Sequence, residues 1–190
     1  MEASPISVLE RGLAAEGVEV GIIVVGGTAL NLLGIVQRTT NDVDVLAILQ
    51  DRAGSGGVTL APPDPLPEPF QRAIARVARD FQLPEDWMNT VVGLQWQTGL
   101  PPGLERRLRW RRYGGLRVGL VARYDLIFLK LYAAADSGGP SGVHFQDLLA
   151  LRPTERELQA AVAWVREQDP TPEFSTIVEQ VMTHARESVG

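Results

Sequence analysis

The stretch Gly26-Gly27-Thr28-Ala29-Leu30 decides the fold of this chain, together with Arg38-Thr39-Thr40-Asn41-Asp42-Val43-Asp44-Val45, which follows shortly after it. The apolar run from Ile22 to Val25 predicts a buried strand, and the two glycines after it permit a tight turn where the backbone can approach a ligand. A short helix is expected to begin at Thr28 and to end near Gly34. The free N–H groups at the start of that helix could hold an anion, so this segment predicts a phosphate site.

Two carboxylates lie two residues apart in the second stretch. Asp42 and Asp44 belong to Asp-Val-Asp-Val-Leu-Ala-Ile, whose β-branched alternation predicts a strand with both carboxylates on one face. A divalent cation would relieve their repulsion, and hard oxygen ligands suit Mg²⁺ or Mn²⁺ bridging nucleotide phosphates. We expect the strands that contain Val25 and Asp42 to lie side by side, so that the glycine turn and the carboxylates meet at one edge.

These two stretches resemble the signature of the DNA polymerase β-type nucleotidyltransferase superfamily. More narrowly, they resemble small bacterial nucleotidyltransferase-like proteins that include toxins of abortive-infection and type IV toxin–antitoxin systems. The resemblance covers roughly residues 20 to 165 and continues in three later segments: Asp86-Trp87-Met88-Asn89, Asp125 to Ala133, and His144-Phe145-Gln146-Asp147-Leu148.

The resemblance implies a reaction as well as a fold. It implies that Asp42 and Asp44 bind the metal, and that the nucleoside triphosphate is held by Gly26, Gly27 and Thr28. An acceptor would then attack the α-phosphate, and pyrophosphate would leave. Arg38 between these elements either binds phosphate through its guanidinium group or covers the loop.

The resemblance also implies a third carboxylate on a neighbouring strand. The strand expected over Val91 to Trp96 contains no acid, and Asp86 lies before it. Asp147 could serve if its helix folds over the site. The sequence therefore offers no clear third acidic ligand.

Lys130 interrupts a helical segment, Leu126 to Ala133, that is apolar nearly all round. A buried ammonium group needs a carboxylate or a ligand phosphate as its partner, unless the side chain extends to water. With the resemblance, this favours a catalytic role for Lys130. Asp125 at the start of the segment is expected to be the N-cap of the helix.

His144 and Asp147 lie three residues apart and share one face if Val143 to Leu151 is helical. Asp147 is either a functional carboxylate or a hydrogen-bonding group within the core, and His144 is expected to be structural. A metal site made from this pair is not expected, because His184 is the only other histidine and the chain has no cysteine. Trp87 and Asn89 are expected to fix a loop and pack the core.

The segment Glu105-Arg106-Arg107-Leu108-Arg109-Trp110-Arg111-Arg112-Tyr113 is strongly basic. Its arginines and aromatic rings could contact RNA, or receive the acidic surface of an antitoxin. The alternative is an arginine-rich edge strand or hairpin that faces solvent, where charge discourages aggregation.

The remaining patterns predict an α+β (mixed α/β) protein: a small nucleotidyltransferase-like core over residues 1–122 and a helical lobe over 123–190 packed on it. Glycine and proline cluster from Arg52 to Pro69, which we expect to be a mobile excursion. Thr154-Glu155-Arg156-Glu157 is a capping-box pattern. The other expected elements are helices over Ile6 to Glu16 after Ser4-Pro5, Phe70 to Phe81, Leu158 to Gln168 and Pro172 to about Glu187, and a strand over Leu116 to Val121.

Composition favours one substantial core. The chain has 190 residues, 45% of them hydrophobic, and its net charge of -5 argues against indiscriminate nucleic-acid binding. No apolar run is long enough to cross a bilayer and no signal-like segment is present, so a cytoplasmic location and no membrane partner are expected.

Two functions follow as expectations. The first is a metal-dependent nucleotidyltransferase that moves a nucleoside monophosphate from an NTP, with Mg²⁺ or Mn²⁺, to RNA, to protein or to a small acceptor. The resemblance implies that the acceptor could be tRNA and that the protein could act as a toxin with a cognate antitoxin. The second is a catalytically inactive protein of the same fold that binds a nucleotide or a protein partner. A dinucleotide-binding oxidoreductase fits less well, because the glycine spacing Gly-x-Gly-x-x-Gly is missing.

Overall fold

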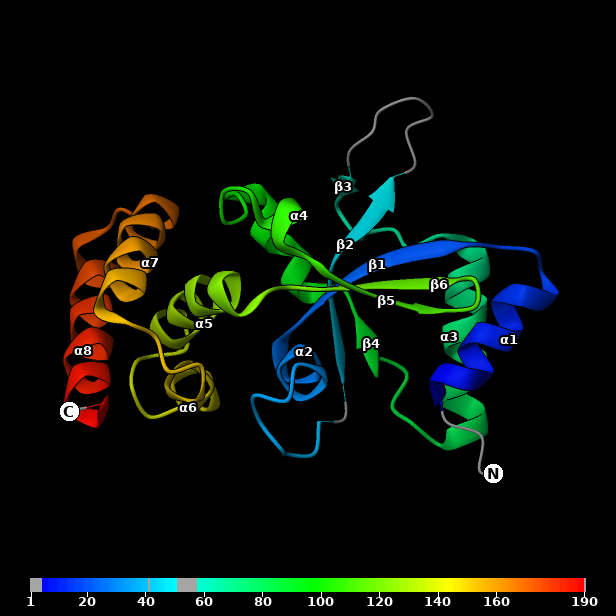
Figure 1. Cartoon of the computed structure of the whole chain (residues 1–190), viewed down its shortest axis with the longest axis horizontal. Coiled ribbons are helices and arrows are strands. Elements are labelled where there is room, and N and C mark those ends of the chain that lie inside the picture. Colours follow the sequence, from blue (N-terminus) through cyan, green and yellow to red (C-terminus); the bar gives the residue numbers. More distant parts are fainter. Residues whose placement is uncertain (1–4, 41, 51–57, 190) are drawn as a thin grey trace. The chain divides into compact units, whose positions relative to one another are not determined.

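A mixed sheet and two groups of helices give the chain an α+β architecture (Figure 1). The computed structural model describes residues 5–40, 42–50 and 58–189. The chain divides into two compact units: unit 1 comprises Met1–Gln97 and Glu105–Val121, and unit 2 comprises Thr98–Leu104 and Ala122–Gly190. The predicted boundary after residue 122 lies one residue from the observed boundary between Val121 and Ala122. Thr98–Leu104, which the prediction assigned to the core, belongs to unit 2.

Unit 1 contains the sheet, whose strand order is β3-β2-β1-β6-β5, with β4 paired to β2. The strands are β1 (Val20–Val25), β2 (Val43–Gln50), β3 (Thr59–Ala61), β4 (Met88–Asn89), β5 (Arg109–Tyr113) and β6 (Leu116–Leu120). β1 is antiparallel to β2 and parallel to β6, which makes the sheet mixed.

The core of unit 1 lies between the sheet and two helices, α1 (Pro5–Ala15) and α3 (Glu68–Phe81). Leu9 and Leu13 lie one helical turn apart on α1, and both are buried in the same hydrophobic cluster as Phe70 of α3 and Ile22 of β1. The expected helices over 6–16 and 70–81 are therefore confirmed with shifted ends.

The register of the sheet brings the two diagnostic stretches together. Val25, at the end of β1, pairs with Asp44 of β2, and Asp44 also pairs with Asn89 of β4. The prediction that the strands of Val25 and Asp42 lie side by side is confirmed. Asp42 itself precedes β2, which begins at Val43.

Two local expectations in unit 1 are wrong. Helix α2 runs over Gly26–Leu32, so it begins at Gly26 and not at Thr28, and the glycines form its first turn. The segment expected to be a strand over Val91 to Trp96 is a 3₁₀ helix, η1 (Val91–Gln97). Side-chain contacts hold η1: Trp96 Nε1 donates to Leu46 O at 2.8 Å, and a side chain on Gly93 would overlap Pro63. Tertiary packing thus overrides the β-branched pattern.

The basic segment forms β5, at one edge of the sheet, and joins β6 in an antiparallel hairpin. Arg109, Trp110, Arg111 and Arg112 are all exposed. The placement of this segment on an exposed edge strand, one of the two alternatives, is confirmed, and contact with RNA or an antitoxin is a separate prediction. Ser4, Asn41 and the first part of the expected excursion lie outside the described residues, and its later part contains β3.

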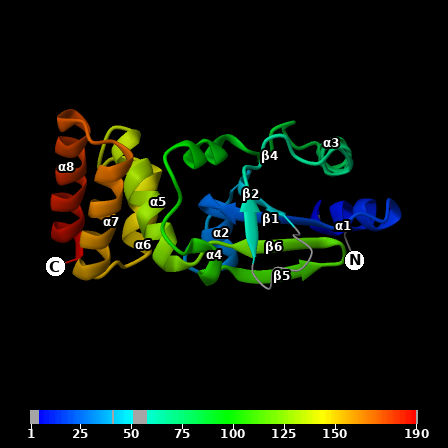
Figure 2. The ribbon, with the colours of Figure 1, turned by 90° about the horizontal axis from the view of Figure 1, so that it is seen from above.

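The helices α5 to α8 of unit 2 pack on one another (Figure 2). They are α5 (Arg123–Asp136), α6 (Val143–Ala150), α7 (Glu155–Gln168) and α8 (Pro172–Val189), and the short helix α4 (Leu104–Arg107) lies at a change of unit. Tyr132 packs against both Trp164 of α7 and Phe174 of α8.

The starts of two helices in unit 2 test the capping predictions. The capping box at Thr154 and Glu157 is present and opens α7, as expected. The expectation for Asp125 is wrong: the N-cap of α5 is Ala122, and Asp125 is the third residue of the helix and fully buried. Asp125 is buried because the apolar residues that follow it, Leu126 and Ile127, pack in the core. No helix among the described residues is long and apolar enough to span a membrane.

Candidate functional site

The end of β1 brings Gly26 against the carboxylate of Asp44. Gly26 has a φ of 69°, and a Cβ at this position would overlap Asp44 Oδ2. Only glycine fits both this backbone conformation and this close approach. Gly26 is therefore the residue that makes room for the half-buried carboxylate of Asp44.

Asp42 is held by two threonine hydroxyl groups. Thr28 Oγ1, on α2, donates to the backbone oxygen of Asp42 at 2.7 Å, and Thr40 Oγ1 donates to Asp42 Oδ1 at 2.8 Å. The Asp42 side chain is exposed. Thr28, expected to contact the triphosphate, thus fixes the backbone next to a carboxylate. Thr40 belongs to the motif quoted above, but its hydrogen bond to Asp42 was not predicted, although Thr two residues before Asp is a recognisable local hydrogen-bonding pattern.

Gly27 faces Arg38 across the loop between α2 and β2. A Cβ on Gly27 would lie 3.0 Å from Thr40 Oγ1 and 3.1 Å from Arg38 Nη2. Asn31 closes this loop, because its Nδ2 donates to Arg38 O at 2.7 Å. The Arg38 side chain is exposed and lies beside the glycine pair, so this arrangement can present a guanidinium group to an anion.

Asn89 lies on the other side of Asp44. Asn89 Nδ2 donates to Asp44 Oδ1 at 3.2 Å, across the paired strands β2 and β4. The position that faces Asp44 from the neighbouring strand therefore carries an amide and not the carboxylate that the resemblance implies. Trp87 is buried and donates to Ile74 O at 3.2 Å, which confirms its expected packing role.

The two carboxylates of unit 1 belong to the class of ligand that divalent cations such as Mg²⁺ prefer. Asp42 and Asp44 provide hard oxygen atoms, and they accept hydrogen bonds from neutral donors. Among the described residues, no group of three or more acidic, histidine or cysteine side chains could hold a metal ion. Magnesium commonly binds through one or two carboxylates and completes its shell with substrate phosphates and water, so two carboxylates are compatible with that mode.

The remaining candidates form a separate cluster in unit 2. Lys130 Nζ lies 2.8 Å from Asp147 Oδ2 and 3.4 Å from His144 Nδ1. The side chains of Lys130 and Asp147 are only 7% and 3% exposed. The prediction that the ammonium group of Lys130 meets a carboxylate is confirmed, and so is the expectation that His144 and Asp147 share one helix face.

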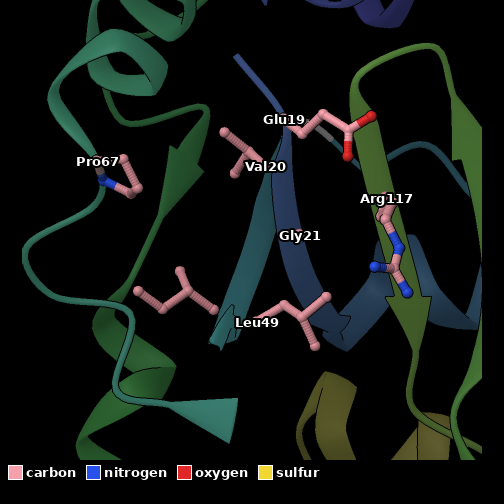
Figure 3. Close-up of a pocket in the computed structure, with 7 residues that line it drawn as sticks. Glu19, Val20, Gly21, Leu49, Pro67 and Arg117 are labelled. Atoms are coloured by element: carbon pink, nitrogen blue, oxygen red, sulfur yellow. The ribbon is translucent and has the colours of Figure 1, made fainter. Parts of the chain in front are cut away.

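A small hollow of about 70 Å³ lies near the start of β1, between Gly21, Leu49 and Arg117 (Figure 3). The carboxylates adjoin the other end of β1, where Val25 pairs with Asp44. A larger and more open groove of about 570 Å³ lies along η1, and Thr90, the residue after Asn89, lines it. The groove is linked to the carboxylates through Asn89, which hydrogen-bonds Asp44, whereas the small hollow lies at the opposite end of β1.

No protein-family model, curated protein or solved structure matches this chain.

Proposed function

We propose that this protein is a metal-dependent nucleotidyltransferase that moves a nucleoside monophosphate from an NTP to an acceptor. One arrangement carries the proposal: the Asp44 carboxylate lies against Gly26, and the Arg38 guanidinium group lies against Gly27. Asp42 is tied to the same turn by hydrogen bonds from Thr28 and Thr40. Paired carboxylates and a cationic side chain at the first turn of α2 suit a polyphosphate with its counter-ion.

Each residue of this cluster has a distinct role in the proposal. Asp42 and Asp44 would hold Mg²⁺ or Mn²⁺, which when bound neutralises phosphate charge and polarises the α-phosphate. Arg38 binds phosphate oxygens, and Gly26 and Gly27 let the triphosphate approach the backbone. Thr28 and Thr40 keep Asp42 in place.

The reaction is a displacement at phosphorus. A nucleophilic oxygen of the acceptor forms a bond to the α-phosphorus, the bond between the α-phosphorus and the bridging oxygen breaks, and pyrophosphate leaves. The acceptor proton passes to a base. On the resemblance alone we also propose Lys130 and Asp147 of unit 2 as catalytic residues; in the structure Lys130 Nζ lies 2.8 Å from Asp147 Oδ2, and both side chains are buried.

The acceptor class and the biological setting rest on the resemblance. RNA such as tRNA, and a toxin role with a cognate antitoxin in the bacterial cytoplasm, are proposed on that ground. The exposed arginines of β5 are compatible with an RNA acceptor.

The test is transfer of label. Purified protein is incubated with each α-³²P-labelled NTP, Mg²⁺ or Mn²⁺, and total bacterial RNA, and label is sought on RNA and on protein. Asp42→Ala/Asp44→Ala is the test variant, and Asp80→Ala, an exposed acid on α3, is the matched control. Label that survives in the control and disappears in the test variant is the expected result.

A second candidate is a catalytically inactive protein that binds a nucleotide or a protein partner. Two observations favour it: Asn89, an amide, faces Asp44, and Asp147 is engaged by Lys130. Binding of NTP that requires Arg38, without transfer to RNA, to protein or to small acceptors, would select this candidate.

A further inference from the structure

We infer that Asn89 is a positioning residue that aims the carboxylate of Asp44 at a bound cation. The inference rests on the proposed function, because it concerns how the same carboxylate is presented. It begins with the backbone: Asn89 and Asp44 are direct partners in the parallel pairing of β4 with β2. Neighbouring residues on paired strands have side chains on the same face, so their contact is built into the sheet.

The amide of Asn89 has only one useful orientation. Its Oδ1 accepts a hydrogen bond from the N–H of Val91 at 3.2 Å, at the start of η1. A carbonyl oxygen must face that donor, so the Nδ2 group must face the other way. There it donates to Asp44 Oδ1 at 3.2 Å. The turn into η1 thus fixes which end of the amide meets the carboxylate.

The two oxygens of Asp44 then have different surroundings. Oδ1 is occupied by Asn89, whereas Oδ2 lies where a side chain on Gly26 would be. Gly26 and Asn89 together restrict rotation of the carboxylate. Oδ2 is consequently the oxygen presented on the side of the glycine pair, where the phosphates are proposed to bind.

The neutrality of Asn89 is part of its effect. A lysine or arginine here would fix Asp44 equally well, but its charge would compete with a cation. An amide donor orients the carboxylate without adding a positive charge beside it. Partners of this kind commonly change metal affinity by 10-fold or more when they are removed.

Two substitutions separate positioning from simple structural support. Asn89→Ala removes both contacts. Asn89→Asp keeps an oxygen for the N–H of Val91, because aspartate makes the same turn, but replaces the donor to Asp44 with a carboxylate. A purely structural role predicts that Asn89→Asp resembles wild type or is destabilised without any gain in cation binding.

The measurement is Mn²⁺ binding in the absence of nucleotide, by electron paramagnetic resonance and by titration calorimetry, with thermal unfolding recorded with and without Mn²⁺. We expect Asn89→Ala to bind Mn²⁺ about 10-fold more weakly than wild type. We expect Asn89→Asp to bind more tightly than wild type, and to gain more thermal stability from Mn²⁺, because the cation relieves repulsion between two facing carboxylates.

The outcomes are distinct. Mn²⁺ binding by wild type that is unchanged in Asn89→Ala would overturn the inference and leave the proposed metal site intact. Equal loss of binding in both variants, with equal loss of stability, would also overturn it, since that is the pattern of structural damage. Failure of wild type to bind Mn²⁺, also in the presence of an NTP, would remove the proposed function and this inference with it.

Discussion

Lys130 Nζ lies 2.8 Å from Asp147 Oδ2, and this buried ion pair joins α5 to α6. Removing Lys130 takes the opposite charge away from a carboxylate whose side chain is only 3% exposed. We therefore expect Lys130→Met to lower the free energy of unfolding by about 3–5 kcal/mol. Urea denaturation followed by circular dichroism measures this loss.

The double variant Lys130→Met/Asp147→Leu is the matched control, because it removes both charges together. It is expected to recover most of the stability that the single variant loses. A folded double variant without transfer activity would support a chemical role for the pair. A single variant as stable as wild type would contradict the assignment of this pair as a buried ion pair.

Substitution of Gly26 is expected to destabilise the folded protein through two effects that a control variant can separate. Gly26→Ala introduces a strained backbone at positive φ and a Cβ that overlaps Asp44 Oδ2. Gly34→Ala introduces the first effect alone, since Gly34 has a φ of 73° and no atom within 4 Å of its would-be Cβ.

We expect Gly34→Ala to lose about 1–2 kcal/mol of unfolding free energy, and Gly26→Ala to lose more and to weaken Mn²⁺ binding as well. Thermal unfolding and calorimetry of the two variants provide the comparison. Equal effects in both would show that Asp44 makes no steric demand on Gly26.

Glu157 links the stability of α7 to pH. Hydrogen bonding from the Arg123 side chain is the main reason that the pKa of Glu157 is lowered from 4.5 to about 2, and hydrogen bonds from Thr154 add to it against the effect of burial. A carboxylate with a lowered pKa stabilises the folded state fully above its unfolded pKa, and this contribution is lost as the pH falls towards 2.

The variant Glu157→Gln lacks this titration. The stability difference between wild type and Glu157→Gln should therefore be largest above pH 5 and shrink as the pH falls from 4.5 to 3. Urea midpoints measured across that range test it, with Glu173→Gln, an exposed first-turn glutamate of α8, as the comparison. A constant difference would mean that Glu157 is not coupled to Arg123.

The arginines of β5 give a prediction about the acceptor. Arg111 Nη2 donates to Leu32 O at 2.7 Å, and Arg112 pairs with Glu19 at 2.8 Å, yet both side chains remain exposed. If RNA is the acceptor, Arg109→Ala/Arg111→Ala/Arg112→Ala should weaken RNA binding and reduce its salt dependence.

Filter binding at several salt concentrations measures both quantities. Arg11→Ala/Arg76→Ala/Arg79→Ala removes the same charge from exposed positions of α1 and α3 and serves as the control. The same loss in both triple variants would show an effect of net charge, and no loss in the β5 variant would exclude this surface from RNA contact.

Much of the candidate site could be predicted because its signals are local. Gly26 and Gly27 follow an apolar strand, and Asp44 lies in the next strand with Asp42 just before it, so their meeting required only that adjacent strands pair. Thr40 and Asn89 were harder to predict. The contact of Thr40 with Asp42 depends on the loop geometry, and that of Asn89 with Asp44 depends on a pairing between residues 45 positions apart.

The two wrong predictions, a strand over Val91 to Trp96 and an N-cap at Asp125, failed because tertiary packing decides both segments. The sequence over Val91 to Gln97 has the composition of a strand, but Gly93 packs on Pro63 and Trp96 bonds to the backbone of β2, which holds it as a 3₁₀ helix. Asp125 is a residue type that commonly caps the N-terminus of a helix. Here the apolar residues that follow it are buried, so the first turn of α5, with Asp125 in it, lies inside the core.

The sequence by itself determined the α+β class, the strand with its glycine pair, the carboxylates that follow, and the capping box of α7, because hydrophobic period, turn chemistry and capping act over a few residues. Only the tertiary structure decided that Asn89 faces Asp44 and that Lys130 is neutralised by Asp147. Those contacts join segments distant in the chain, and they form where packing and strand register bring the segments together.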